Sequence, residues 1–204
     1  KQLKALLPIL IGLQVVFYGF FIFYEGWEMA ILFSVLFLVL LAYNFPKKGF
    51  RNTPPLELFA QFGYLLIVPF SMILNETDAV PWLTYGYLVL FAVQSQLIGE
   101  VMDIEPDRKA KRKTTATQLG VKGTKCLIIT IVLIEVLLLV FCYQDFIFGG
   151  MLACGLLWLL LDLLVIYKGK IYSLKEMQFF GIGSNLVALA SMIYVWWSGV
   201  LMNY

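Results

Sequence analysis

Seven long apolar segments are the feature that most constrains how this chain of 204 residues can fold. Each is close to the roughly 20 residues that an α-helix needs to cross the hydrocarbon core of a bilayer. The segments are continuous and rich in leucine, which argues against the alternating strands of a membrane barrel. We therefore expect an all-α, polytopic transmembrane bundle of about seven spans. The segments are residues 5–24, 28–44, 57–75, 80–98, 126–143, 147–167 and 177–199.

Composition excludes the main alternatives to a membrane protein. Hydrophobic residues make up 61% of the chain and charged residues 14%, which is more apolar surface than a soluble domain of this size can bury. There is no histidine, and this excludes histidine–metal sites and Ser-His-Asp triads. The three cysteines, Cys126, Cys142 and Cys154, lie in apolar segments without CxxC spacing, so we interpret them as packing residues.

The basic residues predict the orientation of the chain in the membrane. When the loops are assigned alternately to two sides, all 15 Lys and Arg residues fall on the side that holds the N-terminus. The positive-inside rule places this side in the cytoplasm and the C-terminus on the opposite side. Contact with membrane lipids accounts for the basic loops, and no nucleic acid is needed as a partner.

The most polar segment, residues 99–120, follows the fourth apolar segment on the predicted cytoplasmic side. Asp103 and Asp107 are four residues apart and Glu100 is one turn earlier, so a continuing helix would place their carboxylates on one face. Clustered carboxylates repel one another unless a cation neutralises them. A hard ion such as Mg²⁺ accepts these oxygen ligands together with phosphate oxygens. The alternative is a solvated loop of mixed charge, and Pro106 is able to break the helical geometry.

A second polar cluster, Tyr43-Asn-Phe-Pro-Lys47, ends the second apolar segment on the same side. Lys47 is placed to contact an anionic group, and Tyr43 is able to donate a hydrogen bond to it. The alternative is an interfacial tyrosine beside a lysine that extends to the membrane surface, since both are common at bilayer boundaries.

Together the two clusters resemble the UbiA superfamily of intramembrane prenyltransferases. The segment DIEPDRKAKRKTTATQLG is similar to the second aspartate-rich motif of that family, which is DxxxD followed by basic residues, Thr and Gly. The segment YNFPK matches the family's YxxxK motif, and the Pro54-Pro55-Leu stretch after it is similar to the family's loop. Two helices separate the two motifs and three follow, so the resemblance covers essentially the whole chain.

The resemblance implies a helical bundle with a central cavity that opens to the membrane. It implies that Asp103 and Asp107 bind Mg²⁺ on a polyprenyl diphosphate, with Glu100 assisting. The activity implied is transfer of the prenyl group to a lipophilic, aromatic acceptor within the membrane.

The resemblance also implies residues that bind the substrate. Tyr43 and Lys47 would contact the diphosphate or help to hold the leaving group. Arg112 and Lys113 are further candidates to bind its negative charge.

The chain departs from the family in two respects. The family usually has nine helices and a first motif, NDxxD, whereas this sequence has seven apolar segments and no such motif. Residues 1–204 would then form one transmembrane domain, the C-terminal seven of nine helices, and the start at Lys1 rather than Met favours part of a longer enzyme. Lys111 stands where the family usually has glycine after DxxxDxxx, which disfavours the tight turn expected there.

The residues are also compatible with two other functions. The missing first motif is also expected of a non-catalytic, UbiA-like subunit or lipid-binding partner in a larger membrane complex. A transporter is a weaker alternative, because it needs ionisable residues along a path through the bilayer. Only Glu135 and Asp162 are of this kind, and each is equally interpreted as a contact between helices.

Several uncharged polar residues within the spans also have two interpretations. Gln94, Ser95 and Gln96 would line a polar entrance or would join helices by hydrogen bonds. We interpret Ser184 and Asn185 as packing residues of the last span.

Overall fold

The computed structural model describes residues 2–45 and 49–202, and these residues form helices and connecting turns without a strand. The all-α prediction is confirmed, and all seven predicted segments correspond to helical regions. The helices are α1 (Gln2–Glu25), α2 (Trp27–Asn44), η1 (Phe50–Asn52), η2 (Leu56–Gln61), α3 (Phe62–Leu65), α4 (Ile67–Asn75), α5 (Trp82–Met102), α6 (Ile104–Lys109), α7 (Thr115–Phe141), α8 (Phe146–Leu161), η3 (Asp162–Ile166) and α9 (Leu174–Ser198).

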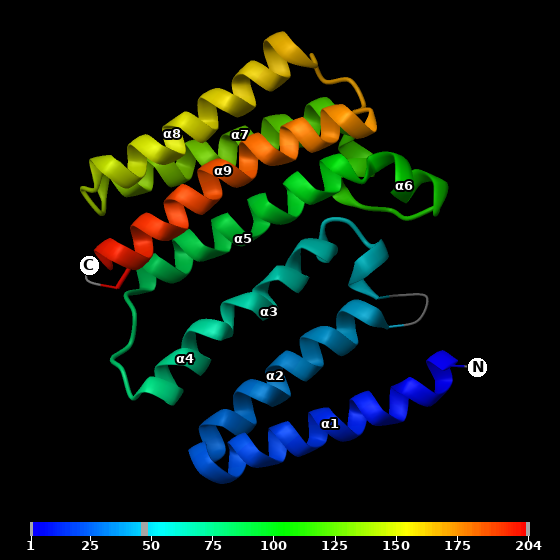
Figure 1. Ribbon diagram of the computed structural model, residues 1–204, viewed down its shortest axis with the longest axis vertical. Coiled ribbons are helices and arrows are strands. Elements are labelled where there is room, and N and C mark those ends of the chain that lie inside the picture. The colour runs from blue at the N-terminus through cyan, green and yellow to red at the C-terminus, as the bar shows by residue number, and fades with distance from the viewer. Residues whose placement is uncertain (1, 46–48, 203–204) are drawn as a thin grey trace.

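Length and hydropathy make five of these helical regions candidate membrane spans, among the residues described. They are Trp27–Asn44, Leu56–Asn75, Thr115–Phe141, Phe146–Ile166 and Leu174–Ser198. A shorter apolar stretch, Ile11–Glu25, lies within α1. With α1 and α5, which run beside these five, the arrangement agrees with a bundle of about seven spans (Figure 1).

Helix α5 lies between two groups of helices. Helices α1, α2 and the α3–α4 segment lie side by side on one side of α5, whereas α7, α8 and α9 lie on the other (Figure 1). The first turn of α1 and the last turn of α9 lie at opposite ends of the bundle (Figure 1). The N-terminus, α6 and the connection from α8 to α9 share one end, which we call the basic end because the loops there carry the Lys and Arg residues (Figure 1).

The best-packed part of the bundle lies between α5, α7, α8 and α9. Leu97, Ile128 and Phe180, from three of these helices, are completely buried there. By contrast, only Met29 is buried in α2, so α1 and α2 present most of their apolar side chains outward. Outward-facing apolar residues are expected of helices surrounded by lipid, where the bilayer takes the place of a protein interior.

Local capping fixes where the later helices begin. Thr114 and Thr117 form a capping box at the start of α7, and Ser173 and Glu176 form another at the start of α9. The Asp145 carboxylate accepts a hydrogen bond from the Phe148 N–H at 2.8 Å and so caps α8. These side chains satisfy backbone N–H groups that the first turn of a helix leaves without partners.

Two boundaries differ from the prediction, because polar residues continue helices that hydropathy alone would end. Helix α5 extends to Met102 rather than residue 98, and α7 begins at Thr115 rather than residue 126. Most of the predicted polar loop is therefore helical. A kink at Gly120, with φ of 70°, separates the first turn of α7 from the rest of the helix.

The prediction that every Lys and Arg residue lies in a loop is wrong for Lys125. It lies inside α7, is 1% exposed, and forms an ion pair with the completely buried Asp162. The Tyr172 hydroxyl donates to Asp162 at 2.9 Å, and the Lys125 ammonium lies 4.4 Å from the Tyr172 ring centroid. Burial, together with the Asp162 carboxylate, raises the pKa of Tyr172, so its hydroxyl remains a donor. Asp162 thus forms a contact between helices, which was one of the two interpretations of this residue.

Glu135 is also completely buried in α7. Neither of its carboxylate oxygens has a hydrogen-bond partner among the described residues. It does not line any of the three cavities discussed below.

Candidate functional site

The two aspartates of the DxxxD motif lie at a break between helices rather than on one continuous helix. Helix α5 ends at Met102, Asp103 has non-helical dihedral angles, and α6 begins at Ile104. The Asp107 N–H still donates to the Asp103 carbonyl at 2.9 Å, which keeps the two residues one helical turn apart. Pro106 lies in the first turn of α6, where a proline is tolerated.

The turn after α6 forms although Lys111 replaces the expected glycine. Lys111 has φ of 55°, in the left-handed region that favours glycine. The Arg112 N–H donates to the Asp107 carbonyl at 2.9 Å, which closes the turn beside the motif. Lys111 was expected to disfavour this turn. The chain nevertheless adopts the turn, at the cost of an unfavourable backbone conformation at Lys111.

Lys111→Gly is therefore expected to stabilise the protein by about 1 kcal/mol, since glycine adopts a positive φ without the clash of a Cβ. This corresponds to a rise of about 2–4 °C in the Tm of the detergent-solubilised protein. Lys109→Gly is the matched control, because it removes the same charge from a helical position and is expected to lower the Tm. Equal Tm changes for the two variants would contradict the proposed strain.

A polar cavity of about 170 Å³ lies at the basic end of the bundle, next to the motif. It is enclosed by the end of α2, by η1 and η2, by the last turns of α5, and by α6 with the following turn. Asp103, Asp107 and Tyr43 all line it, so the fold brings together residues from the two sequence motifs. The full lining is Tyr43, Arg51, Glu57, Gln96, Gly99, Glu100, Asp103, Asp107, Arg112 and Thr114.

Glu100 lines the cavity, but both of its carboxylate oxygens already accept hydrogen bonds from the protein. Its Oε2 accepts a hydrogen bond from the Ala116 N–H at 3.1 Å, and its Oε1 accepts one from the Gln96 amide at 3.1 Å. Gln96 is in turn hydrogen-bonded to Gln61. Both interpretations of Gln96 apply, because it lines a polar cavity and also joins two helical segments by a hydrogen bond.

Glu57 is a site residue that sequence reasoning missed. It is 1% exposed and accepts a hydrogen bond from the Thr115 N–H, so Glu57 and Glu100 together hold the first turn of α7. Its other oxygen, Oε2, is buried and has no hydrogen-bond partner among the described residues. The signal in the sequence was a carboxylate at the first position of an otherwise apolar segment.

Two arginines supply positive charge to the cavity. Arg112, which the sequence predicted, forms an ion pair with Asp107 at 3.3 Å, and its side chain is 43% exposed. Arg51, which the prediction omitted, lines the cavity from η1. Within the described residues, Arg51 has no carboxylate partner, so its guanidinium is available to an anion.

The remaining predicted residues divide into three cases. Tyr43 lines the cavity from the last turn of α2. Lys113 is exposed and is not part of the cavity lining. Lys47 lies outside the described residues.

The oxygen donors of the cavity fit a divalent cation that shares its ligands with a phosphate. No three His, Cys, Asp or Glu side chains in the described part of the chain gather closely enough to form a metal site alone. However, Mg²⁺ is commonly held by one or two carboxylates and completes its shell with phosphate oxygens and water. Asp103 and Asp107 meet that requirement, whereas Glu100 already accepts two hydrogen bonds from the protein.

Fold and site together define a polytopic membrane protein with a cavity at one end of its bundle that is lined by carboxylates and two arginines. The model of the UbiA prenyltransferase family matches residues 2–182, and the chain belongs to this family. The predicted resemblance is confirmed.

Curated relatives include a lycopene elongase/hydratase from Corynebacterium glutamicum, which is 24% identical over 115 residues. The match covers 55% of this chain and 40% of that protein. A second lycopene elongase/hydratase from the same species matches with the same identity and coverage. The chain therefore matches less than half the length of these relatives. No solved structure gives a significant match.

Proposed function

We propose that the polar cavity binds the diphosphate of a polyprenyl diphosphate together with Mg²⁺. The intact protein then transfers the prenyl group to a lipophilic, aromatic acceptor within the membrane. We further propose that residues 1–204 act as one transmembrane domain whose basic end faces the cytoplasm. Family membership and the two lycopene elongase/hydratase relatives support prenyl transfer in general.

One observation carries this proposal, namely that both aspartates of the motif share a cavity with Tyr43 and two arginines. A cavity lined by carboxylates alone would repel a diphosphate, and one lined by arginines alone would need no metal. The combination suits an anion that arrives with a divalent cation, because the aspartates would hold the cation and the arginines would bind the phosphate oxygens.

Asp103 and Asp107 would hold the Mg²⁺ ion, which when bound stabilises the negative charge that develops on a departing diphosphate. Arg51 and Arg112 bind the same charge through guanidinium hydrogen bonds, and Tyr43 donates a further hydrogen bond to the leaving group. The carbon–oxygen bond breaks, and the diphosphate leaves with the electron pair. The resulting allylic cation is attacked by the acceptor, which then loses a proton.

The apolar helices around the cavity protect this reaction. An allylic cation is consumed by water if water reaches it, so the bundle must keep the reacting carbon dry. The isoprenoid chain has no favourable path through water and enters from the bilayer. Aromatic side chains, which make up 16% of the residues, are able to stabilise a nearby cation.

The direct test is a prenyl-transfer assay on the intact protein in proteoliposomes, with a radiolabelled polyprenyl diphosphate and a mixture of aromatic lipid acceptors. We expect labelled lipid product in the presence of Mg²⁺ and none with a chelator. Absence of product and of diphosphate release under both conditions would contradict the proposal.

Arg51→Ala is expected to raise the KM for the prenyl diphosphate about tenfold or more, because one charge-assisted hydrogen bond to phosphate is lost. Arg108→Ala is the matched control, since Arg108 is exposed on α6 and does not line the cavity. Steady-state kinetics of both variants check this. If the KM of Arg51→Ala equalled that of Arg108→Ala, then Arg51 would not contribute to binding of the diphosphate.

A non-catalytic membrane subunit is the second candidate function. It is favoured by the small number of free carboxylates, since Glu57 and Glu100 are hydrogen-bonded to α7 and Asp107 is paired with Arg112. This alternative predicts that the protein co-purifies with a stable partner complex. It also predicts that the intact protein binds the diphosphate without turning it over.

A further inference from the structure

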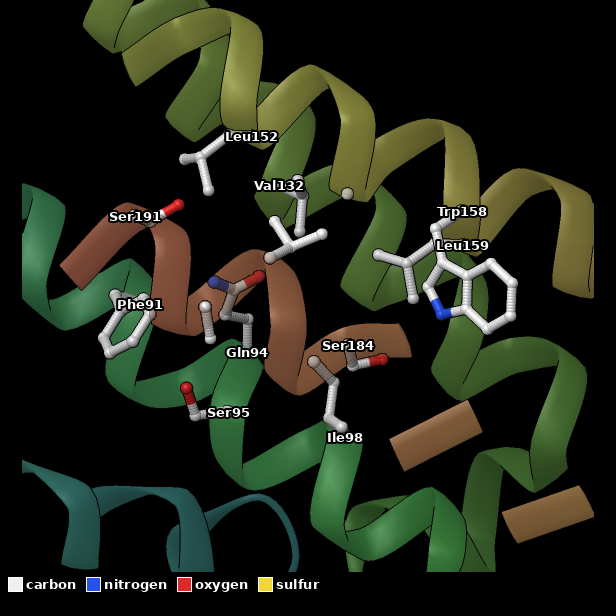
Figure 2. Close-up of a pocket in the computed structure, with 13 residues that line it drawn as sticks. Phe91, Gln94, Ser95, Ile98, Val132, Leu152, Trp158, Leu159, Ser184 and Ser191 are labelled. Carbon is white, nitrogen blue, oxygen red and sulfur yellow. The ribbon is translucent and has the colours of Figure 1, made fainter. Parts of the chain in front are cut away.

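A second pocket lies inside the bundle, between α5, α7, α8 and α9, and we call it the intramembrane pocket. Its volume is about 70 Å³. Gln94 extends into it from α5, and Ser184 and Ser191 face it from α9, two turns apart on one face of that helix (Figure 2). The indole of Trp158 borders it from α8 (Figure 2).

Four polar side chains around this pocket have no hydrogen-bond partner among the residues that the structure describes. Gln94 is 6% exposed, and its amide makes no hydrogen bond with a described residue. Ser191 is 5% exposed, and its hydroxyl is buried without a partner, as are the Ser184 hydroxyl and the Trp158 Nε1–H. Unsatisfied polar groups are costly in a bilayer, where no bulk water is available to them. Of these four groups, the Gln94 amide retains accessible surface at the pocket, so it is the group that a ligand there is able to contact directly.

The geometry of Trp158 is supported by a glycine on the facing helix. A Cβ on Gly183 would lie 2.5 Å from the Cε2 atom of the Trp158 ring, so only glycine allows the indole to lie against α9 at this position. Gly183 therefore permits close approach of α8 and α9 beside the pocket.

The intramembrane pocket adjoins a larger apolar pocket of about 260 Å³. The two share Phe91, Ala188 and Ser191, and the second is lined almost entirely by apolar side chains from α5, α8 and α9. The intramembrane pocket is itself mostly apolar and carries the Gln94 amide, so together the two pockets match a molecule that has a small polar head and a hydrocarbon tail. No charged side chain lines either pocket, so an ionic head group would be left without a partner.

This pair of pockets is distinct from the polar cavity. Gln94 and Ile98 line the intramembrane pocket, whereas Gln96, Gly99 and Asp103 line the polar cavity. At 100° per residue these two sets lie on different faces of α5. A molecule bound in the intramembrane pocket is therefore separated from the diphosphate site by the helix itself.

We propose that the intramembrane pocket binds a neutral lipid with a hydroxyl or carbonyl head and a long hydrocarbon chain. The Gln94 amide both donates to and accepts from this head, and the apolar pocket takes the chain. This site does not depend on the prenyl-transfer activity.

The test is photolabelling of the purified intact protein in detergent with a diazirine-bearing C16 alcohol, followed by peptide mapping. We expect saturable labelling of peptides from α5 and α9, with unlabelled hexadecanol competing at least five times better than hexadecane. Gln94→Leu keeps the size of the side chain and removes its hydrogen bonds, so it is expected to weaken binding about tenfold. Ser71→Ala is the matched control, because Ser71 is exposed on α4 and lies outside both pockets.

A second measurement separates binding from folding. Without added lipid, Gln94→Leu is expected to have a Tm equal to or above that of the wild type, because the amide it removes is unsatisfied. An Asp103→Asn variant is expected to be photolabelled like the wild type, whether or not the protein transfers prenyl groups. Labelling that is equal in Gln94→Leu and the wild type, or equal competition by hexadecane and hexadecanol, would overturn the proposal. So would a marked fall in the Tm of lipid-free Gln94→Leu.

Discussion

Asp107→Asn is expected to reduce the kcat of the intact protein by about 10²–10³-fold, while leaving its Tm within about 2 °C of the wild type. The carboxylate is lost as a ligand for Mg²⁺, and the amide that replaces it keeps the size of the side chain. Asp103→Asn is expected to have an effect of the same order, because both aspartates line the cavity. Single-turnover assays at saturating prenyl diphosphate measure this directly.

Glu105→Gln is the control for these two variants. It removes a negative charge from the same short helix, α6, but Glu105 does not line the polar cavity. Its kcat is expected to remain within about twofold of the wild type, as for a surface change away from the reacting groups. If Glu105→Gln were as defective as Asp107→Asn, then the general charge of α6, and not a metal site, would explain the loss.

The largest effect on stability is expected from separating Lys125 and Asp162. Each partner is almost completely buried, so Asp162→Asn or Lys125→Met alone leaves a buried charge uncompensated. Such a loss typically costs about 3–5 kcal/mol of folding free energy. In Asp162→Asn, the Lys125 ammonium retains its position over the Tyr172 ring, but this contact replaces only a part of the lost energy.

The double variant Lys125→Met/Asp162→Leu is expected to recover most of that loss, because replacing both charges with apolar groups removes the cost of desolvating them. Denaturation of the wild type, Lys125→Met, Asp162→Leu and the double variant in a mixed-micelle system gives the coupling free energy between the two positions. Additive losses in the double variant would show that the pair does not act as a unit, contrary to the geometry described above.

Hydropathy predicted the spans because each one is a long apolar segment, and a helix that crosses a bilayer must be mostly apolar. It failed at Thr115 and Lys125, where polar residues continue a helix that packs against α5 and α8. The Lys125–Asp162 pair joins α7 to η3, and no local pattern relates residues so far apart in the sequence.

Likewise, the sequence predicted some residues of the site and missed others. The shared location of Tyr43 and Asp103 followed from the two motifs and the order of the helices. Arg51 and Glu57 were missed because short helical turns after α2 carry them into the cavity, and hydropathy does not describe such turns. The engagement of Glu100 with the start of α7 depends on the kinked path of the chain between residues 103 and 115.

Equilibrium binding tests the central claim most directly, because it requires neither an acceptor nor turnover. A non-reactive polyprenyl thiodiphosphate would be titrated into the purified intact protein, with Mg²⁺ or with a chelator, for the wild type and the double variant Asp103→Asn/Asp107→Asn. We expect affinity in the wild type to fall at least 100-fold when Mg²⁺ is removed, and the double variant to bind weakly under both conditions. Equal affinity of the two proteins in the presence of Mg²⁺ would contradict a metal–diphosphate site at these aspartates.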